Sequence, residues 1–352
     1  MPDVHLTIDG KEVSAPSNTT ILKAAEAVGI KIPTLCAHPA LKPIGACRVC
    51  LVEVESERLL QPACAFPVSE GMVVHTNSPK AREARRLILE LLLANHPLDC
   101  MTCESAGSCE LQDLAYEYGI KESRFAGQQY DWPIQDANPF IVRDYSKCIL
   151  CRRCISACEE INGVRAIAML GRGFDSKVGT AFDGSLQDSP CEFCGMCIAV
   201  CPTGALSPKS AIGAGRTWEG EKITTICPYC GVGCTLDVHV KENRIIGVES
   251  NWEGASNHGW TCVKGRFGWD FVGDADRLTT PLIKKDGQFV EASWDEALDL
   301  VADRFVEIAE ERGPDALAFL SSAKCTNEEN YLVQKLSRAL IGTNNVDHCA
   351  RL

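Results

Sequence analysis

Cysteines at short, repeated spacings are the residues of this chain best suited to chemistry. The sequence contains 21 cysteines, and all but Cys325 and Cys349 fall into five groups. In chain order the groups are Cys36, Cys47, Cys50 and Cys64; Cys100, Cys103 and Cys109, with His96 just upstream; Cys148, Cys151, Cys154 and Cys158; Cys191, Cys194, Cys197 and Cys201; and Cys227, Cys230, Cys234 and Cys262. Thiolates at such spacings hold iron–sulfur clusters. The sequence therefore predicts five clusters that form a path for electrons.

The composition argues against two other uses of these cysteines. Disulfide frameworks are typical of short secreted chains with an even number of cysteines, whereas this chain has 352 residues and an odd number. The first residues, Met1 to His5, lack the basic and apolar regions of a signal peptide, which predicts a reducing, cytoplasmic location. Zinc is an alternative for any cysteine quartet, but two runs with identical spacing favour clusters.

The charge and hydropathy patterns indicate whether the protein binds nucleic acids or membranes. The formal net charge is −12, and nucleic acids and anionic membranes both favour basic surfaces. We therefore expect no nucleic-acid partner. The longest apolar segment, residues 87–94, contains Glu90 and is far too short to span a bilayer, so we expect no direct membrane insertion.

The third and fourth groups carry the strongest signal. Each has the spacing Cys-x2-Cys-x2-Cys-x3-Cys, and the two runs lie 43 residues apart, which indicates an internal duplication. Pro202 follows the second run, whereas Glu159 stands at the matching position of the first. This is the pattern of two-cluster bacterial ferredoxins, in which the fourth cysteine of each run ligates the other cluster. It predicts one [4Fe-4S] cluster on Cys148, Cys151, Cys154 and Cys201, and another on Cys191, Cys194, Cys197 and Cys158.

The first two groups suggest a binuclear and a tetranuclear site. A binuclear cluster needs four thiolates, and the first group supplies four at a variant of the plant-type ferredoxin spacing. The second group has only three cysteines, so His96 is a candidate fourth ligand, although a histidine just past a helix end is often a capping residue. Both sites resemble those of NADH:quinone oxidoreductase large subunits and iron-only hydrogenases. The resemblance implies one [2Fe-2S] cluster and a [4Fe-4S] cluster with one histidine and three cysteine ligands.

The fifth group resembles the cluster domain at the start of molybdenum or tungsten bis-pterin oxidoreductases. Gly231 and Gly233 lie between its first three cysteines, where glycine lets the backbone wrap closely around a cluster. Within that family the stretch is most similar to formate dehydrogenases. This implies a fifth cluster, of the [4Fe-4S] type, and a role for Lys264 as an electron relay between cluster and pterin. Most lysines are instead solvated surface residues.

Residues 321–331 resemble the pterin-cofactor edge of formate dehydrogenases. The segment follows an expected buried strand and opens a helix, and ligands of α/β sheets bind at such positions. The resemblance implies cofactor contacts by Ser322, Cys325 and Asn327, although Cys325 could equally be a small buried residue. In the full-length protein the cofactor would be a molybdenum or tungsten bis(molybdopterin guanine dinucleotide).

The elements around these motifs predict an α+β multidomain fold. Asp9-Gly10 predicts a hairpin, and Ser78-Pro79 predicts a helix start, with Ala84, Leu87, Ile88, Leu91 and Leu92 on the inner face. The expected domains are 1–78, a β-grasp [2Fe-2S] ferredoxin; 79–119, the histidine-ligated segment; 138–210, the two-cluster ferredoxin; 220–276, the fifth-cluster domain; and 277–352, the incomplete start of an α/β molybdopterin-binding domain.

The C-terminal region predicts alternating strands and helices. Ser293 and Glu296 form a capping box for a helix that ends near Arg312. A buried strand at 316–320, a helix at 328–341 and a strand at 344–348 are expected to follow. In the formate dehydrogenases that the chain resembles, the metal-ligating cysteine or selenocysteine comes next. We therefore expect no metal-ligating catalytic residue within the chain, and expect that ligand immediately after Leu352. A frame ended at a UGA codon and a deliberate fragment are both compatible with that position.

These resemblances imply the N-terminal part of a formate dehydrogenase α subunit. Formate would be oxidised to CO2, and electrons would pass along the clusters to a separate flavin- and NAD(P)-binding iron–sulfur subunit, because no G-x-G-x-x-G motif follows a strand. The alternatives are an NADH:quinone oxidoreductase-like subunit, an iron-only hydrogenase, and an electron-transfer protein without its own catalysis. The ferredoxin pair and Lys264 count against the first alternative, and the fifth cysteine group counts against the second.

Overall fold

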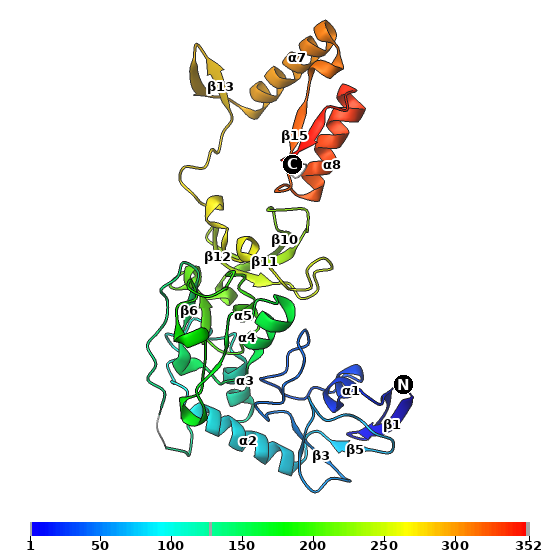
Figure 1. Ribbon diagram of the computed structural model, residues 1–352, viewed down its shortest axis with the longest axis vertical. Coiled ribbons are helices and arrows are strands. Elements are labelled where there is room, and N and C mark those ends of the chain that lie inside the picture. Colours follow the sequence, from blue (N-terminus) through cyan, green and yellow to red (C-terminus); the bar gives the residue numbers. More distant parts are fainter. Residues whose placement is uncertain (1, 127–128, 350–352) are drawn as a thin grey trace. The chain divides into compact units, whose positions relative to one another are not determined.

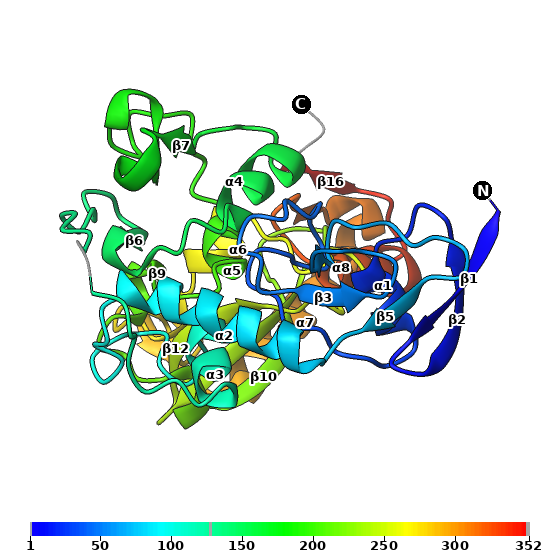
Figure 2. The same cartoon turned by 90° about the horizontal axis from the view of Figure 1, so that it is seen from below.

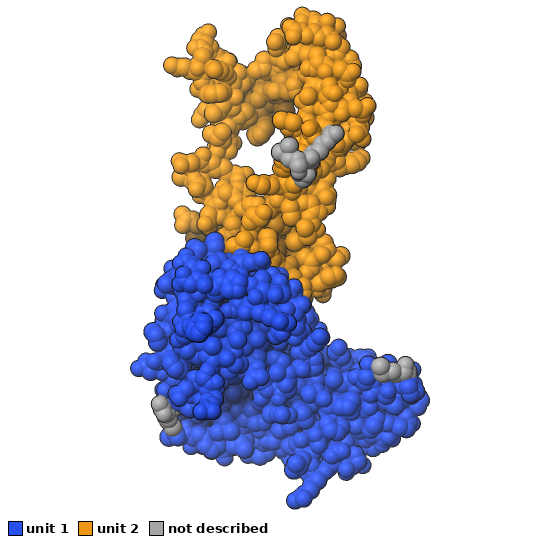
Figure 3. Space-filling model, viewed as in Figure 1, with its two compact units in different colours: residues 1–219 blue, residues 220–352 orange. Residues whose placement is uncertain are grey.

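The computed structural model describes residues 2–126 and 129–349 and divides the chain into two compact units, Met1–Glu219 and Gly220–Leu352 (Figure 3). The first unit contains four of the five cysteine groups, and the second contains the fifth. Within the described ranges, every helix is too short or too polar to cross a bilayer.

A five-stranded sheet opens the first unit (Figure 1). Its strands, in the spatial order β2-β1-β5-β3-β4, are β1 (Asp3–Ile8), β2 (Lys11–Pro16), β3 (Leu51–Val54), β4 (Gln61–Pro62) and β5 (Val73–His75). The predicted hairpin is confirmed, because Asp9 and Gly10 adopt the positive φ angles (47° and 80°) that its two-residue turn requires. Helix α1 (Ile21–Ala27) packs on this sheet through the fully buried Ile21.

Helix α2 (Pro79–Ala94) begins at the predicted residue. Ser78 is its N-cap, and the Ser78 side chain accepts a hydrogen bond from the backbone N–H of Ala81. The predicted inner face is wrong in part, because Leu87 and Leu91 are 40% and 51% exposed. The buried positions of α2 are Ala81, Arg85, Leu89 and Glu90.

Two charged side chains of α2 point inward because each finds polar partners there. The Arg85 guanidinium donates to the carbonyl oxygens of Leu51 (2.6 Å) and Thr76 (2.7 Å), which ties α2 to the ends of β3 and β5. The Glu90 carboxylate pairs with Arg124 at 2.6 Å. A buried charge is tolerated only with such partners, and hydrophobic spacing alone carries no information about them.

A second hydrophobic core joins the first two cysteine groups. Helix α3 (Glu110–Glu117) starts directly after Cys109 and lies beside α2 (Figure 2). The core consists of Leu35, Val49, Leu89, Cys109, Leu111, Leu114, Tyr118 and Ile120. Leu35 and Val49 are chain neighbours of cysteines in the first group, so this core fixes the first group relative to the second.

Two structural repeats 43 residues apart follow in the first unit. Helices α4 (Arg153–Ser156) and α5 (Met196–Ala199) occupy matching positions, and β6 (Ile141–Arg143) pairs antiparallel with β9 (Leu206–Pro208) around them. The left-handed residues also match: their φ angles are 54° at Leu150, 53° at Phe193, 66° at Arg152 and 72° at Gly195. The duplication in the sequence is therefore also a duplication of backbone conformation.

Shorter elements surround these repeats. The hairpin of β7 (Ala168–Leu170) and β8 (Lys177–Gly179) lies between them in the chain and was not predicted. The remaining helical turns of this unit are η1 (Tyr145–Lys147), η2 (Ala157–Ile161), η3 (Gly173–Asp175), η4 (Ala181–Asp183), η5 (Lys209–Ala211) and η6 (Thr217–Glu219).

The second unit begins with a three-stranded antiparallel sheet of β10 (Glu221–Ile226), β11 (Thr235–Lys241) and β12 (Arg244–Ser250). β11 pairs antiparallel with β10 on one side and with β12 on the other. Helix α6 (Val263–Phe267) and the turn η7 (Asp270–Val272) follow. The Arg266 guanidinium donates to the carbonyl oxygen of Val248 at 2.9 Å, which holds α6 against β12.

The C-terminal region has the predicted parallel pair of strands. Its elements are β13 (Leu282–Lys285), β14 (Gln288–Glu291), α7 (Trp294–Arg312), η8 (Pro314–Ala316), β15 (Phe319–Ser321), α8 (Asn327–Lys335), η9 (Leu336–Ile341) and β16 (Val346–His348). β15 and β16 are parallel, and the Ser293–Glu296 capping box is confirmed. A strand is present in the region predicted at 316–320, but β15 starts later, and the expected burial is wrong for Leu320, which is 85% exposed. Parallel sheets are usually covered by helices on both faces, and the two-stranded sheet of β15 and β16 is too small for such a layered arrangement.

Candidate cluster-binding and pterin sites

The four cysteines of the first group lie within contact of one another. The Cys36 thiol contacts those of Cys47 and Cys64, and Cys50 also contacts Cys64. The hydrogen bond from Cys47 is the largest of the influences that lower the pKa of Cys36 to about 2. Four thiols grouped in this way fit a binuclear cluster, which needs four thiolates around two irons.

A backbone N–H two residues after a cysteine donates to its sulfur at several of the predicted ligands. The donors, each followed by its acceptor cysteine, are Val49 and Cys47, Leu150 and Cys148, Arg153 and Cys151, Phe193 and Cys191, Met196 and Cys194, Thr203 and Cys201, and Tyr229 and Cys227. Leu150 and Phe193 adopt left-handed φ angles at these positions. Hydrogen bonds to sulfur are one of the factors that set the potential of a cluster.

The second group places a buried histidine beside three cysteines. His96 is 9% exposed, and its Nδ1 atom has no hydrogen-bond partner among the described residues. Burial lowers the pKa of His96, which favours the neutral imidazole that can ligate a metal. Lys147 is an electrostatic neighbour of both His96 and Cys103. This orphaned nitrogen fits the predicted role of His96 as a fourth ligand.

Residues from outside the second group hold its loop in place. The Arg216 guanidinium hydrogen-bonds the carbonyl oxygens of Cys103 and Met101, the latter at 3.2 Å. A Cβ atom at Gly204 would lie 2.5 Å from Cys103 Sγ, so any larger residue there would force the sulfur to move. Arg216 and Gly204 were not singled out from the sequence, because neither belongs to a cysteine motif.

The third and fourth groups surround one shared cavity. All eight of their cysteines line it, together with apolar side chains such as Ile141 and Val178. Cys201 acts electrostatically on Cys148 and Cys151, and Cys158 acts on Cys191 and Cys194. The fourth cysteine of each run is thus a neighbour of the other run.

Burial raises the pKa of these thiols. It raises the pKa of Cys148 to about 11, and it also raises the pKa values of Cys154 and Cys197. Buried thiols that resist ionisation become thiolates when they bind a metal. The cavity therefore fits groups that bring their own positive charge.

In the second unit, the fifth group surrounds the start of α6. Cys230 and Cys262 both act electrostatically on Cys227 and on Cys234. Burial raises the pKa of Cys227, while the positive charge of Lys264 opposes this effect. Lys264 itself is exposed. These contacts gather the four predicted ligands at one site with Lys264 beside it.

The predicted pterin segment contacts the loop of the fifth group. Asn327, the first residue of α8, donates from Nδ2 to the carbonyl oxygen of Gly231 at 2.8 Å. Ser322 Oγ lies 3.3 Å from Cys349 Sγ, at the carboxyl ends of β15 and β16. Cys325 is half-buried and forms no part of the cysteine groups. The structure thus brings Asn327 into contact with the loop of the fifth group.

The cysteines of the third and fourth groups line a cavity rather than converge on one point. In residues 2–126 and 129–349, no three His, Cys, Asp or Glu side chains form a group that could hold one metal ion. A tetrahedral zinc site needs ligand sulfurs about 2.3 Å from one metal. Thiols that line a shared cavity fit polynuclear clusters better.

Family models match five consecutive stretches of the chain. They are described as a 2Fe-2S iron–sulfur cluster binding domain at residues 2–79, an NADH-ubiquinone oxidoreductase-G iron–sulfur binding region at 85–124, an NADH-quinone oxidoreductase subunit 3 ferredoxin-like domain at 138–207, a molybdopterin oxidoreductase Fe4S4 domain at 221–274, and a molybdopterin oxidoreductase domain at 277–352. Each of the five cysteine groups falls within one of the first four stretches, the third and fourth groups sharing one.

Similar proteins extend this agreement over nearly the whole chain. The G 2 subunit of NADH-quinone oxidoreductase from Rhizobium meliloti is 42% identical over 99% of this chain and 40% of its own length. The NADPH-Fe(3+) oxidoreductase subunit alpha of Geobacter sulfurreducens is 40% identical with the same coverage. A Staphylococcus aureus protein provisionally named a formate dehydrogenase is 33% identical over 98% of this chain and 39% of its own length. The chain spans about 40% of the length of these relatives.

A solved structure matches part of the chain. A chain of NAD+-reducing [NiFe]-hydrogenase in the H2-reduced state is 34% identical, with a TM-score of 0.55, and the match covers 58% of this chain and 87% of that one. Together with the order of cluster-binding and pterin-binding stretches, these matches lead to one conclusion. The chain belongs to the molybdopterin oxidoreductase family whose N-terminal iron–sulfur domains are like those of the G-type NADH-quinone oxidoreductase subunits.

Proposed function

We propose that the chain is the electron-transferring N-terminal part of a formate dehydrogenase catalytic subunit. One [2Fe-2S] and four [4Fe-4S] clusters would carry electrons between a molybdopterin centre and a partner subunit that binds flavin and NAD(P). Relatives named for NADH or NADPH support a nicotinamide-linked partner.

The contacts between successive cysteine groups are the observation that carries the proposal. In the first unit, Cys109 Sγ lies 3.6 Å from the carbonyl oxygen of Pro202, the residue after Cys201. Cys103 lies against Gly204. Sites in contact through such short stretches of chain can exchange electrons, which supports an electron path within the first unit rather than separate structural sites there. When bound, the clusters would supply one-electron transfer, and the chain would set their spacing and potentials.

The choice of formate as substrate rests on the second unit. Lys264 lies two residues after Cys262, where it would relay electrons between the fifth cluster and the pterin. Ser322, Cys325 and Asn327 would contact the pterin, and the hydrogen bond from Asn327 to Gly231 supports the closeness of the two sites. The provisionally named relative from Staphylococcus aureus also supports formate.

A second candidate is a subunit that passes electrons from NAD(P)H to a quinone or a metal-ion acceptor. It is favoured by the higher identity to the NADH-quinone and NADPH-Fe(3+) oxidoreductase subunits, 42% and 40%, than to the formate-named relative, 33%. Both candidates use the same clusters and differ in the reaction at the pterin centre.

Cluster reduction by different donors distinguishes these functions. The full-length catalytic subunit, of which this chain would be the N-terminal part, would be isolated with its partner subunits, oxidised, and mixed with NADH, NADPH or formate. Its clusters would be followed by electron paramagnetic resonance. The formate proposal predicts that both a nicotinamide and formate reduce the clusters. Lys264→Met should block reduction by formate only, whereas Lys284→Met, a control at an exposed position, should block neither. Reduction by a nicotinamide but never by formate would favour the second candidate, and reduction by dithionite alone would contradict both.

A further inference from the structure

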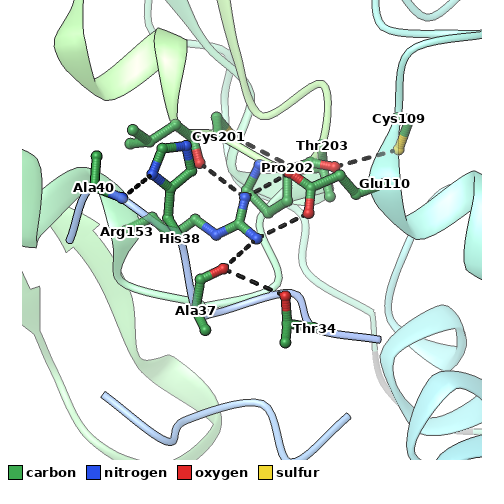
Figure 4. A network of polar contacts seen from close by, with 11 residues as sticks. Thr34, Ala37, His38, Ala40, Cys109, Glu110, Arg153, Cys201, Pro202 and Thr203 are labelled. Carbon is green, nitrogen blue, oxygen red and sulfur yellow. Dashed lines mark hydrogen bonds and ion pairs between the residues drawn. The ribbon is translucent and has the colours of Figure 1, made fainter. Parts of the chain in front are cut away.

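A buried guanidinium lies where three candidate cluster-binding loops meet (Figure 4). Arg153 is 3% exposed. Its Nη2 atom donates to the carbonyl oxygen of Ala37 at 2.8 Å, and its Nη1 atom lies 3.4 Å from the carbonyl oxygen of Val200. The same two nitrogens form a two-bond ion pair with the Glu110 carboxylate, at 2.5 and 2.8 Å. One side chain therefore links segments more than a hundred residues apart.

Each partner of Arg153 is a chain neighbour of a predicted cluster ligand. The neighbouring pairs are Ala37 with Cys36, Glu110 with Cys109, and Val200 with Cys201. Arg153 itself lies between Cys151 and Cys154, and its backbone N–H donates to the Cys151 sulfur. The network thus touches the first, second, third and fourth cysteine groups through residues that are not ligands themselves.

The charge of Arg153 also acts on these sites. An arginine keeps its positive charge at any ordinary pH, and this one acts electrostatically on Cys151 and Cys201. Its partner Glu110 is 45% exposed, so water screens the carboxylate more than the buried guanidinium. Reduction adds negative charge to a cluster, and a nearby positive charge favours that step.

We propose that Arg153 is a positioning residue for electron transfer, which fixes three cluster-binding loops relative to one another and raises the reduction potentials of the clusters they hold. The inference rests on the proposed function only in that the cysteine groups must bind clusters. It assigns a shared structural and electrostatic role to a residue outside the ligand set.

Redox titration of the cluster-loaded full chain, followed by electron paramagnetic resonance, tests the electrostatic part. Arg153→Gln removes the buried charge, and Glu110→Gln removes its counter-charge. Arg172→Gln is the control, because Arg172 is an exposed arginine of the same unit and is not among the residues that line the shared cavity. Relative to the control, Arg153→Gln should change the reduction equilibrium of the cluster on Cys148, Cys151, Cys154 and Cys201 by about tenfold toward the oxidised form, which is about 59 mV for one electron. Glu110→Gln should shift it in the opposite direction.

Hydrogen exchange on the same samples tests the positioning part. Arg153→Lys keeps the charge but lacks the planar fork that reaches three partners at once. It should therefore leave the potentials close to those of the control while exchange rises several-fold at segments 36–41, 107–112 and 198–203.

The outcomes separate this inference from the proposed function. Equal potentials in Arg153→Gln, Glu110→Gln and the control would overturn the electrostatic role, and unchanged exchange in Arg153→Lys would overturn the positioning role. Should Arg153→Gln fail to load clusters, the reduction potential of Glu110→Gln decides between the outcomes. A higher potential than in the control supports the electrostatic role, and an equal or lower potential overturns it. The potentials are measured without a partner subunit, so failure of NAD(P)H or formate to reduce the clusters would refute only the proposed function.

Discussion

At the scale of single residues, hydrogen bonds and burial set the protonation states of the candidate ligands. Backbone N–H groups point at sulfurs two residues earlier, and burial opposes ionisation of thiols such as Cys109, whose pKa it raises to about 11. The same burial keeps His96 neutral and leaves its Nδ1 atom without a partner among the described residues. An unpartnered buried nitrogen costs free energy until it finds a partner, which favours ligation of a metal by His96.

Replacing His96 by cysteine should retain the second-group cluster and lower its reduction potential. A thiolate is negatively charged where the imidazole is neutral, and the more negative cluster accepts an electron less readily. The midpoint potential, measured by redox titration with electron paramagnetic resonance, checks this. His96→Ala should instead lose the cluster, and full cluster content in His96→Ala would exclude His96 as a ligand.

Gly204→Ala should disrupt the second-group cluster, although Gly204 is not a ligand. The added Cβ would lie 2.5 Å from Cys103 Sγ, closer than real contacts allow, so the sulfur must move. Iron and acid-labile sulfide content should fall relative to the wild type. Gly184→Ala is the control, because the nearest atom to its Cβ would be 3.5 Å away. Equal loss in both variants would mean that the effect is general destabilisation.

At the scale of elements, short pieces of structure hold the sites through polar contacts as much as through apolar packing. In the second unit, the Asp237 carboxylate on β11 accepts hydrogen bonds from Thr224 of β10 at 2.7 Å and from Asn251 at 2.9 Å. Asp237 is 7% exposed. This buried carboxylate ties together the three-stranded sheet that supports the fifth cysteine group.

Asp237→Asn should destabilise the second unit by about 1.5–3 kcal/mol, the usual contribution of hydrogen bonds to a charged group. Burial raises the pKa of Asp237, but the hydrogen bonds from Asn251 and Thr224 outweigh it and the net pKa is lowered. A lowered folded-state pKa gives stability that is present above the unfolded value, about 3.9, and is lost as pH falls below it. Urea unfolding at several pH values should reveal this loss in the wild type and less of it in Asp237→Asn. Asp276→Asn, at an exposed position, should behave like the wild type.

At the scale of the whole molecule, one long helix leaves an apolar face exposed. Helix α7 has no buried residue, and its face of Trp294, Leu298 and Val301 is 67%, 58% and 49% exposed. Monomeric proteins rarely leave such apolar faces open. The chain spans about 40% of the length of its relatives, which have further chain that could cover the matching face.

The double variant Leu298→Glu and Val301→Lys should reduce aggregation of the 352-residue chain without changing its clusters. Light scattering and binding of a hydrophobic dye should both fall, because the apolar face of α7 becomes polar, while the visible absorption of the clusters stays the same. In a full-length relative, the matching substitutions should instead reduce stability. Unchanged light scattering would mean that the chain does not aggregate through the apolar face of α7.

The cysteine groups, their order, the duplicated run and the termini of several helices can be predicted from the sequence alone. These features are local. The spacing of ligands depends on residues close together in the chain, and caps such as Ser78 and Ser293 act within one helical turn. The inner face of α2 was predicted wrongly because Arg85 and Glu90 are buried through partners from other segments. Only the tertiary structure decided that Gly204 lies against Cys103 and that Arg153 joins Ala37, Glu110 and Val200. Such contacts join residues up to 116 positions apart, and chain spacing cannot encode a meeting that depends on how whole elements pack.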